Sequence, residues 1–204
     1  MLITVDPGSS AADAAMRSMF EARKRVFVDL LGWDLPVLAG RYEVDQFDDV
    51  HARYLILTDR DQNHLASARL LPTVRPHILG DLFADLCEDA PPQGPDIYEI
   101  TRFCLERYAS AQLRRQARNQ LVTALADFAL TNGITAYTGV AEISWLQQIL
   151  AFGWRCRPLG LPKRIGGMTL GALRIEITSD TPALLAAAGI YSPAADAVIE
   201  AEAA

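Results

Sequence analysis

A carboxylate and a guanidinium lie three residues apart, at Glu99 and Arg102, in a stretch with the composition of a β-strand. The stretch, Ile97–Glu106, is rich in β-branched and aromatic residues and follows a loop of Pro, Gly and Asp. In a regular strand Glu99 shares one face with Thr101 and Phe103, and Arg102 lies on the other. Both faces also carry apolar residues, so we expect a central, buried strand whose charges are paired. The candidate partners are Arg23, Asp45, Asp48 and Arg69.

The elements that must position these charges can be predicted from periodicity and from turn residues. A helix is expected from about residue 11 to 30, capped by Ser9 or Ser10, and a long helix from Ser110 to about Thr131. The other predicted elements are strands at 2–5, 54–58, 65–71, 134–140, 154–159 and 168–177, short helices at 82–87 and 143–152, and an Ala-rich tail after 179 that could be helical.

This order of elements predicts an α/β fold, a single-domain α/β/α sandwich around a mixed, mostly antiparallel sheet. A central strand followed by a long helix and a parallel strand is similar to the acyl-CoA N-acetyltransferase (GNAT) architecture. On element order alone this is an analogy.

Composition excludes several classes of function. The 204 residues are 50% hydrophobic and 22% charged, as in ordinary globular proteins, and the net charge of −6 disfavours nucleic acid as a partner. Three cysteines and three histidines lack metal-ligand spacing, which predicts reduced thiols and no metal. No apolar run has transmembrane length, and the first residues lack signal-peptide features. We therefore expect a cytoplasmic protein with no membrane span.

Five short motifs follow one another along the first half of the chain. They are Arg23-x-x-Val26-Phe27, Leu31-Gly32-Trp33, Glu43-x-Asp45-x-x-Asp48, Ser67-x-Arg69-Leu70-Leu71-Pro72-Thr73 and Glu99-x-Thr101-Arg102-Phe103. Together they resemble the N-acyl-homoserine lactone synthases, the autoinducer synthases of bacterial quorum sensing. The match runs from roughly residue 1 to 103, and beyond it the resemblance is mainly one of fold and hydrophobicity. Thr101 departs from the serine of many members but keeps the hydroxyl.

The resemblance implies a reaction and a division of the chain. The α-amine of S-adenosylmethionine attacks the thioester of an acyl-acyl carrier protein, and the methionyl carboxylate then displaces methylthioadenosine to close the lactone. S-adenosylmethionine is thus a substrate, and no cofactor is implied. Residues 1–105 would form the catalytic half, 106–179 the acyl and carrier half, and 180–204 a tail. The implied catalytic residues are Glu99, Arg69, Asp45 and Asp48, and the implied S-adenosylmethionine-binding residues are Arg23, Phe27, Trp33, Thr101, Arg102 and Phe103.

The chemistry of these side chains is compatible with that substrate. Aromatic rings such as Phe27 and Trp33 can face the sulfonium and stack on adenine. Asp45 and Asp48 can attract the positive groups, and an arginine can hold the carboxylate. An α-amine has a pKa of about 8, so a modest base such as Glu99 suffices. The alternative is that the rings belong to the core and the charges form a structural ion-pair network.

The second half offers candidates for the acyl pocket and for carrier docking. The acyl-pocket candidates are Leu125, Thr138, Val140, Trp145, Leu146 and Ile149. Trp145 could cap the tunnel or belong to the core, and Thr138 could favour a 3-oxo group. The docking candidates are Arg114, Arg115 and Arg118, with Lys163 and Arg164, and the alternative for them is a solvated face.

The absence of one motif bears on which acyl donor the protein uses. Acetyltransferases of this fold bind the coenzyme A pyrophosphate with a Gly-rich turn that opens the long helix. Residues 113–119 contain no glycine, which favours a carrier-protein-linked pantetheine over free coenzyme A. Two other functions stay open: a coenzyme A-dependent N-acyltransferase for another amine, and a non-catalytic ligand-binding relative.

Overall fold

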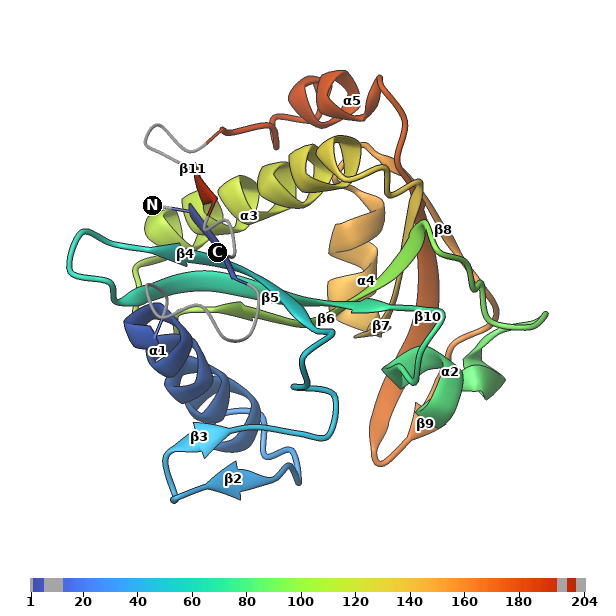
Figure 1. Cartoon of the computed structure of the whole chain (residues 1–204). Coiled ribbons are helices and arrows are strands. Elements are labelled where there is room, and N and C mark those ends of the chain that lie inside the picture. The colour runs from blue at the N-terminus through green and yellow to red at the C-terminus, as the bar shows by residue number, and fades with distance from the viewer. Residues whose placement is uncertain (1, 6–12, 194–197, 201–204) are drawn as a thin grey trace. The chain divides into compact units, whose positions relative to one another are not determined.

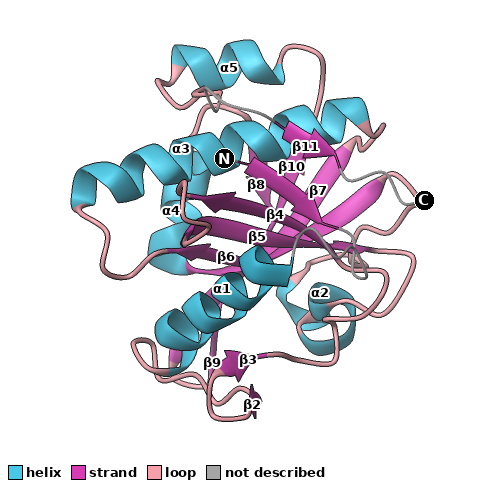
Figure 2. Cartoon of the chain, turned by 60° about the vertical axis from the view of Figure 1, so that its left-hand side comes forward, coloured by secondary structure: helices cyan, strands magenta, loops and turns pink. Residues whose placement is uncertain are grey.

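The computed structural model describes residues 2–5, 13–193 and 198–200. It consists of strands that pair mostly antiparallel and of helices that connect them along the chain (Figures 1 and 2). The chain divides into two compact units. Unit 1 comprises residues 1–69, 102–124 and 192–204, and unit 2 comprises residues 70–101 and 125–191. The predicted class, a mixed α/β fold with a mostly antiparallel sheet, is confirmed.

The sheet strands of unit 1 follow the order β11, β1, β4, β5 and β6. β1 is antiparallel to β4 and parallel to β11. β4 and β5 are buried along almost their whole length, as expected for strands covered on both faces. The bounds are β1 Leu2–Val5, β4 Arg53–Thr58, β5 His64–Pro72, β6 Ile97–Leu105 and β11 Val198–Glu200.

The predicted first helix is two helical segments joined end to end. α1, Asp13–Arg23, continues into a five-residue π-helix, η2, Lys24–Val28. The π-helix bonds include Asp29 N–H to Lys24 O (3.1 Å). A small hairpin, β2 (Val37–Leu38) and β3 (Tyr42–Glu43), follows, and β3 lies beside α1 (Figure 1). The predicted caps Ser9 and Ser10 lie outside the described residues.

In unit 2 the strands follow the order β6, β7, β10 and β8, and β9 also pairs with β10. β6 and β7 are parallel over Ile97–Glu99 and Ala136–Thr138, whereas β10 is antiparallel to β7, β8 and β9. The bounds are β7 Ala136–Glu142, β8 Arg155–Pro158, β9 Lys163–Ile165 and β10 Met168–Glu176. The parallel pair makes the sheet mixed, as predicted.

The short helices of unit 2 differ from the prediction. Instead of one helix at 82–87, the chain forms α2, Ile78–Leu82, and a 3₁₀ turn, η3, Ala84–Leu86. Leu79 and Leu86 from these segments pack against Leu170 and Ala172 of β10. α4 (Ile143–Leu150) and α5 (Thr181–Ala187) are the other short helices of this unit.

The long helix α3, Ala111–Thr131, begins and ends as predicted. The Ser110 hydroxyl accepts a hydrogen bond from Leu113 N–H (3.2 Å), and Gly133, with φ +67°, supplies the left-handed residue that ends the helix. The helix buries Ala117, Leu121 and Leu125, while Leu113 is exposed. Among the described residues, no helix has both the length and the apolarity needed to cross a membrane.

Candidate active site

Three arginines and three carboxylates of unit 1 form one closed network of ion pairs. The guanidinium of Arg23 binds both oxygens of Asp48 (2.8 Å each) and donates from Nε to Glu43 (2.5 Å). Arg69 binds both oxygens of Asp45 (2.6 and 3.0 Å) and contacts Asp48 (2.7 Å). Such bidentate pairs fix the geometry of both partners.

Arg102 closes the network on one side. Its Nη2 donates to Asp45 Oδ2 (2.7 Å) and to Glu43 Oε1 (3.1 Å). The prediction that Arg102 is paired is confirmed for one of its candidate partners, Asp45. Tyr54 adds a neutral donor, because its hydroxyl bonds Asp48 Oδ1 (2.8 Å).

The electrostatics of the network favour the charged forms. Burial by itself raises the pKa of a carboxylic acid, but the hydrogen bond and charge of Arg23 hold the pKa of Asp48 far below its ordinary value. Burial is likewise outweighed at Asp45, whose pKa is lowered by Arg69 and Arg102. Burial opposes the charge of Arg23 too, yet its acidic partners raise its pKa. These groups stay ionised at neutral pH.

Two members of the network reach the surface. The side chains of Arg102 and Asp45 are 9% and 6% exposed, whereas those of the other four are at most 1% exposed. A charged ligand could therefore touch the network at Asp45 and Arg102 without disturbing its buried part. Arg23, Asp48 and Arg69 hold these two in place.

Aromatic rings border the exposed end of the network. Phe27, in the π-helix, stacks on Trp33 with ring centroids 5.0 Å apart and planes 22° apart. The Arg102 guanidinium lies over the Phe27 ring at 5.6 Å. Phe27 is buried with Ala22 and Cys104, and Trp33 is partly buried. The two rings are therefore both core residues and neighbours of the charged groups.

A local distortion of β6 turns Arg102 toward its acids. Arg102 has φ +50°, a left-handed conformation that is uncommon for residues other than glycine. Ile97, Glu99 and Thr101 are buried before it and Cys104 is buried after it, so the alternation of burial shifts by one residue at Arg102. An extra residue of this kind is typical of a β-bulge. The predicted regular alternation holds up to Thr101 and shifts there, so Phe103 does not continue it.

Glu99, in unit 2, is completely buried on β6. One carboxylate oxygen, Oε1, accepts a hydrogen bond from the backbone N–H of Leu79 (2.9 Å), in the first turn of α2. No pattern in the sequence indicates this partner. The predicted neighbourhood of Glu99 and Arg69 stays a prediction.

Register places Glu99 in a row of side chains on one face of the sheet. Glu99 pairs with Thr138 of β7, Thr138 with Arg174 of β10, and Arg174 with Arg157 of β8. Laterally paired residues point to the same side of a sheet. The Thr138 hydroxyl in this row is buried and has no hydrogen-bond partner among the residues that the structure describes.

The six acyl-pocket candidates are divided between the two faces of this sheet. Val140 shares the face of Thr138 and packs against the cluster formed by Leu79, Leu86, Leu170 and Ala172. On the other face, the Tyr137 hydroxyl bonds Leu125 O (3.0 Å), and a Cβ added to Gly171 would meet Leu146 at 2.8 Å.

The remaining acyl-pocket candidates belong to α4. Trp145 makes an edge-to-face contact with Phe152 at 5.8 Å, and Ile149 O accepts a hydrogen bond from the Trp154 indole (2.9 Å). Trp145 is thus part of an aromatic cluster, in line with the core alternative.

The docking candidates differ in exposure. Arg114 and Arg115 are exposed on α3, and Lys163 and Arg164 are exposed on β9. Arg118 is half-buried, and its guanidinium donates twice to the side-chain oxygen of Asn119 (2.8 and 3.1 Å). Of the three α3 arginines, Arg114 and Arg115 are thus the ones available to a partner.

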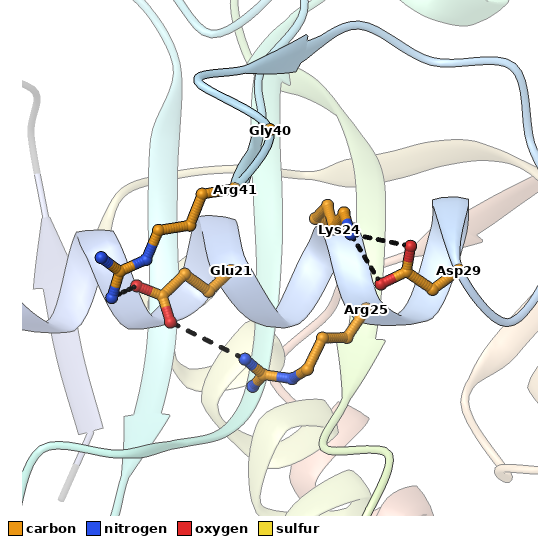
Figure 3. A pocket seen from close by; sticks show the side chains of 6 residues that line it. All are labelled: Glu21, Lys24, Arg25, Asp29, Gly40 and Arg41. Carbon is orange, nitrogen blue, oxygen red and sulfur yellow. Dashed lines mark hydrogen bonds and ion pairs between the residues drawn. The ribbon is translucent and has the colours of Figure 1, made fainter.

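A second group of charges lines a surface pocket of about 170 Å³ on the outside of α1 and η2 (Figure 3). Figure 3 shows that its cations face acids: Lys24 pairs with Asp29 (2.9 Å), and Arg41 and Arg25 with Glu21 (2.7 and 3.8 Å). Partly exposed, mutually paired charges of this kind contribute little to stability.

Two members of the site were not among the predicted residues. Glu43 bridges Arg23 and Arg102, and Tyr54 donates to Asp48. The signal for Glu43 was its spacing in the Glu43-x-Asp45-x-x-Asp48 motif. Tyr54 carried no signal beyond a strand pattern.

The arrangement of elements is shared with known acyltransferases. A structure assigned as an N-acetyltransferase, from Lactobacillus plantarum, aligns with a TM-score of 0.60 at 20% identity, covering 87% of this chain and 98% of that chain. The coenzyme A-dependent acyl-homoserine lactone synthase BjaI, solved with S-adenosylmethionine and isopentyl-CoA, aligns with a TM-score of 0.83 at 25% identity, covering 97% and 95%. The fold is thus that of the N-acyltransferases.

Sequence comparison narrows this class to one family. The family model described as autoinducer synthase matches residues 9–183. An acyl-homoserine-lactone synthase of Ralstonia nicotianae is 32% identical over 189 residues, covering 89% of this chain and 92% of the relative. One of Pseudomonas aeruginosa is 32% identical over 169 residues, covering 81% and 80%. The chain belongs to the autoinducer synthase family, the acyl-homoserine-lactone synthases, as its motifs predicted.

Proposed function

We propose that this protein makes an acyl-homoserine lactone from S-adenosylmethionine and an acyl thioester. The observation that carries the proposal is the closed network of three arginines and three acids. Of its six residues, all of them described, Asp45 and Arg102 are the two that reach the surface. Asp45 can attract the ammonium or sulfonium of S-adenosylmethionine, and Arg102 its carboxylate. The Phe27 and Trp33 rings support this, because they can contact the sulfonium and adenine. BjaI with S-adenosylmethionine, and TofI with methylthioadenosine, are structures of relatives with matching ligands.

The reaction needs one base and no separate cofactor. Glu99 accepts a proton from the α-ammonium of S-adenosylmethionine, directly or through one water. The free amine attacks the thioester carbonyl and the C–S bond breaks. The nitrogen gives its second proton to the leaving thiolate, so the products are the amide and the free thiol of the carrier group. One carboxylate oxygen then attacks the γ-carbon next to the sulfonium, and the C–S bond breaks to release neutral methylthioadenosine. The leaving group is already activated by its positive charge, so positioning dominates the second step.

The acyl chain lies on the Thr138 and Val140 face of the sheet in this proposal. That face also carries Glu99 in the same register, and the buried Thr138 hydroxyl has no partner among the described residues. A carbonyl at the acyl β-position would give that hydroxyl an acceptor, which supports a 3-oxo preference.

For the acyl donor we propose an acyl carrier protein that docks on the basic face of α3. The missing glycine turn and the exposure of Arg114 and Arg115 support it. Coenzyme A is the second candidate, favoured by the likeness to coenzyme A-dependent BjaI. Both substrates are made inside cells, which supports a cytoplasmic location.

The donor is tested by charge reversal. Arg114→Glu with Arg115→Glu should raise KM for the acyl-carrier substrate and leave KM for S-adenosylmethionine unchanged, with Arg60→Glu as an exposed control. Exposed charges steer association and are screened within about 10 Å at 0.1 M salt, so the defect should shrink as salt is added. Equal KM changes for both substrates would contradict docking at this face.

The function itself is tested by the products. Purified protein is incubated with S-adenosylmethionine and a mixed pool of acyl-carrier and acyl-CoA thioesters, and extracts are analysed by mass spectrometry. We expect acyl-homoserine lactone and methylthioadenosine in equal amounts. An acyl-amine without methylthioadenosine would indicate another N-acyltransferase, and no turnover would indicate a binding protein.

A further inference from the structure

The segment between β5 and α2 is fastened to β6 at two points. Thr73 donates to Ile97 O from its hydroxyl (2.8 Å) and from its backbone N–H (3.2 Å). Six residues later, Leu79 N–H donates to Glu99 Oε1 (2.9 Å). The path of residues 73–79 therefore determines where the donor for Glu99 lies.

His77 lies in the middle of this path and is almost completely buried, with 4% of its surface exposed. Its ring Nδ1 is 2.8 Å from Arg75 O, and because a carbonyl can only accept, Nδ1 carries the hydrogen. Nε2 is buried and has no hydrogen-bond partner among the described residues. His77 precedes the first residue of α2, but its side chain makes no capping hydrogen bond to the helix.

Gly80 makes room for this ring. A Cβ added at Gly80 would lie 2.6 Å from Cε1 and 2.8 Å from Nε2 of His77, closer than real Cβ atoms approach other atoms. Gly80 does not have a left-handed φ, so the position needs glycine for space and not for backbone conformation. The ring is thus wedged between the Arg75 carbonyl and the Cα of Gly80.

We propose that His77 is a positioning residue for Glu99. The wedged ring sets the first turn of α2, and that turn aims Leu79 N–H at the Glu99 carboxylate. The catalytic consequence rests on the proposed function, in which Glu99 is the base; the geometric part does not. A displaced ring would move Leu79 N–H, and a base misplaced by about 1 Å can cost on the order of 10²-fold in rate.

Amide hydrogen exchange tests the geometry without any reference to activity. Leu79 N–H bonds Glu99, whereas Asp81 N–H bonds His77 O (3.0 Å) within the same helical turn. In Gly80→Ala and in His77→Asn we expect exchange of the Leu79 amide to accelerate at least tenfold more than that of the Asp81 amide. His51→Asn, at an exposed histidine, is the matched control and should change neither. Equal acceleration of both amides would mean that α2 as a whole unfolds. Unchanged exchange would mean that the ring does not position the Leu79 amide. Either result overturns the proposal.

A double-mutant cycle tests the consequence for catalysis. We expect Gly80→Ala to lower kcat with little change in KM for S-adenosylmethionine. Combined with Glu99→Gln, it should cause no further loss, because the two changes remove the same function. His77→Asn, which keeps a donor for the Arg75 carbonyl, should lose less. Fully additive losses would overturn the proposal. If Glu99→Gln itself keeps its rate, the proposed base is wrong, and the exchange experiment alone decides the role of His77.

Discussion

Burial separates two carboxylates that look equivalent in the sequence. Asp45 and Asp48 both bind arginines, but Asp45 and its partner Arg102 reach the surface while Asp48 and Arg23 do not. In the proposed function, substrate contacts Asp45, whereas Asp48 stays buried against Arg23. The proposal therefore assigns a ligand-binding role to Asp45 and a structural role to Asp48, within one motif.

This difference predicts opposite effects of two matched substitutions. Asp45→Asn removes the charge that faces the ligand, so we expect KM and Kd for S-adenosylmethionine to rise about tenfold or more with a small change in Tm. Asp48→Asn leaves Arg23 buried with a weaker partner, so we expect a loss of about 3–5 kcal/mol in the free energy of unfolding. Calorimetric titration and thermal unfolding measure the two effects. A larger loss of binding in Asp48→Asn than in Asp45→Asn would contradict the assignment.

At the scale of elements, the alternation of side chains along β7 determines which candidate residues lie on the same face of the sheet. This alternation puts Thr138 and Val140 on the face of Glu99, and Tyr137 and Gly139 on the other. Gly139 has a packing role there, because an added Cβ would lie 3.2 Å from Ile100 O.

The face assignment predicts which substitution changes acyl preference. Val140→Ala enlarges the proposed pocket by about two methyl groups, and we expect the product profile to shift toward longer acyl chains. Leu146→Val, on the opposite face, should lower Tm without changing the profile, because it removes only a buried methylene, worth about 1 kcal/mol. Mass spectrometry of products from a mixed donor pool gives both profiles. If the profile shifted in Leu146→Val and not in Val140→Ala, the acyl chain would lie on the opposite face of the sheet, beside α4.

Periodicity and turn residues predicted most of the elements but not their distortions. The strand at 54–58, its hairpin partner, the central strand and α3 with its Ser110 cap follow from local patterns. The positive φ of Arg102 could not be predicted, because nothing in the local sequence demands it. The π-helix after Arg23 was missed for the same reason.

Site residues that belong to the sequence motifs could be predicted. Hydrogen-bond partners that come from distant segments of the chain could not. The acids and arginines of the network all lie in the quoted motifs, although Glu43 was not among the predicted site residues. The bond from Leu79 N–H to Glu99 depends on a helix twenty residues away in the chain, which period-2 reasoning cannot reveal. The split of the acyl candidates between faces required the β7–β10 register.

At the scale of the whole molecule, we expect a buried histidine outside the network to link stability to pH. His64 Nε2 bonds the Ser67 hydroxyl (2.9 Å), and Nδ1 lies 3.8 Å from Glu106, which in turn pairs with Arg25 (2.8 Å). Burial lowers the pKa of His64 despite the opposing effect of Glu106. The folded state therefore keeps His64 neutral at a pH where the unfolded chain binds a proton.

The sign of this effect gives a pH window. Below an ordinary histidine pKa of about 6.5 the unfolded state binds more protons than the folded state, so stability falls as pH falls. The slope should reach about 1.4 kcal/mol per pH unit and end at the lowered pKa of His64. His64→Gln should flatten unfolding free energy against pH in this window, while His51→Gln should not. Denaturant titrations from pH 5 to 7 measure it, and an unchanged slope in His64→Gln would show that other groups dominate.

The most direct test of the account is the pH dependence of kcat in Glu99→Gln. The account holds that Glu99 accepts the proton of the S-adenosylmethionine amine, and the substitution keeps the shape of the side chain while removing its charge. We predict a loss in kcat of roughly 10²-fold or more at neutral pH, weaker effects on S-adenosylmethionine binding, and partial recovery as rising pH deprotonates the amine without help. Glu88→Gln, at an exposed carboxylate, should behave as the wild type. A near-normal kcat at neutral pH, or a lowered Tm with weakened binding and no recovery at high pH, would contradict the assignment of Glu99 as the base.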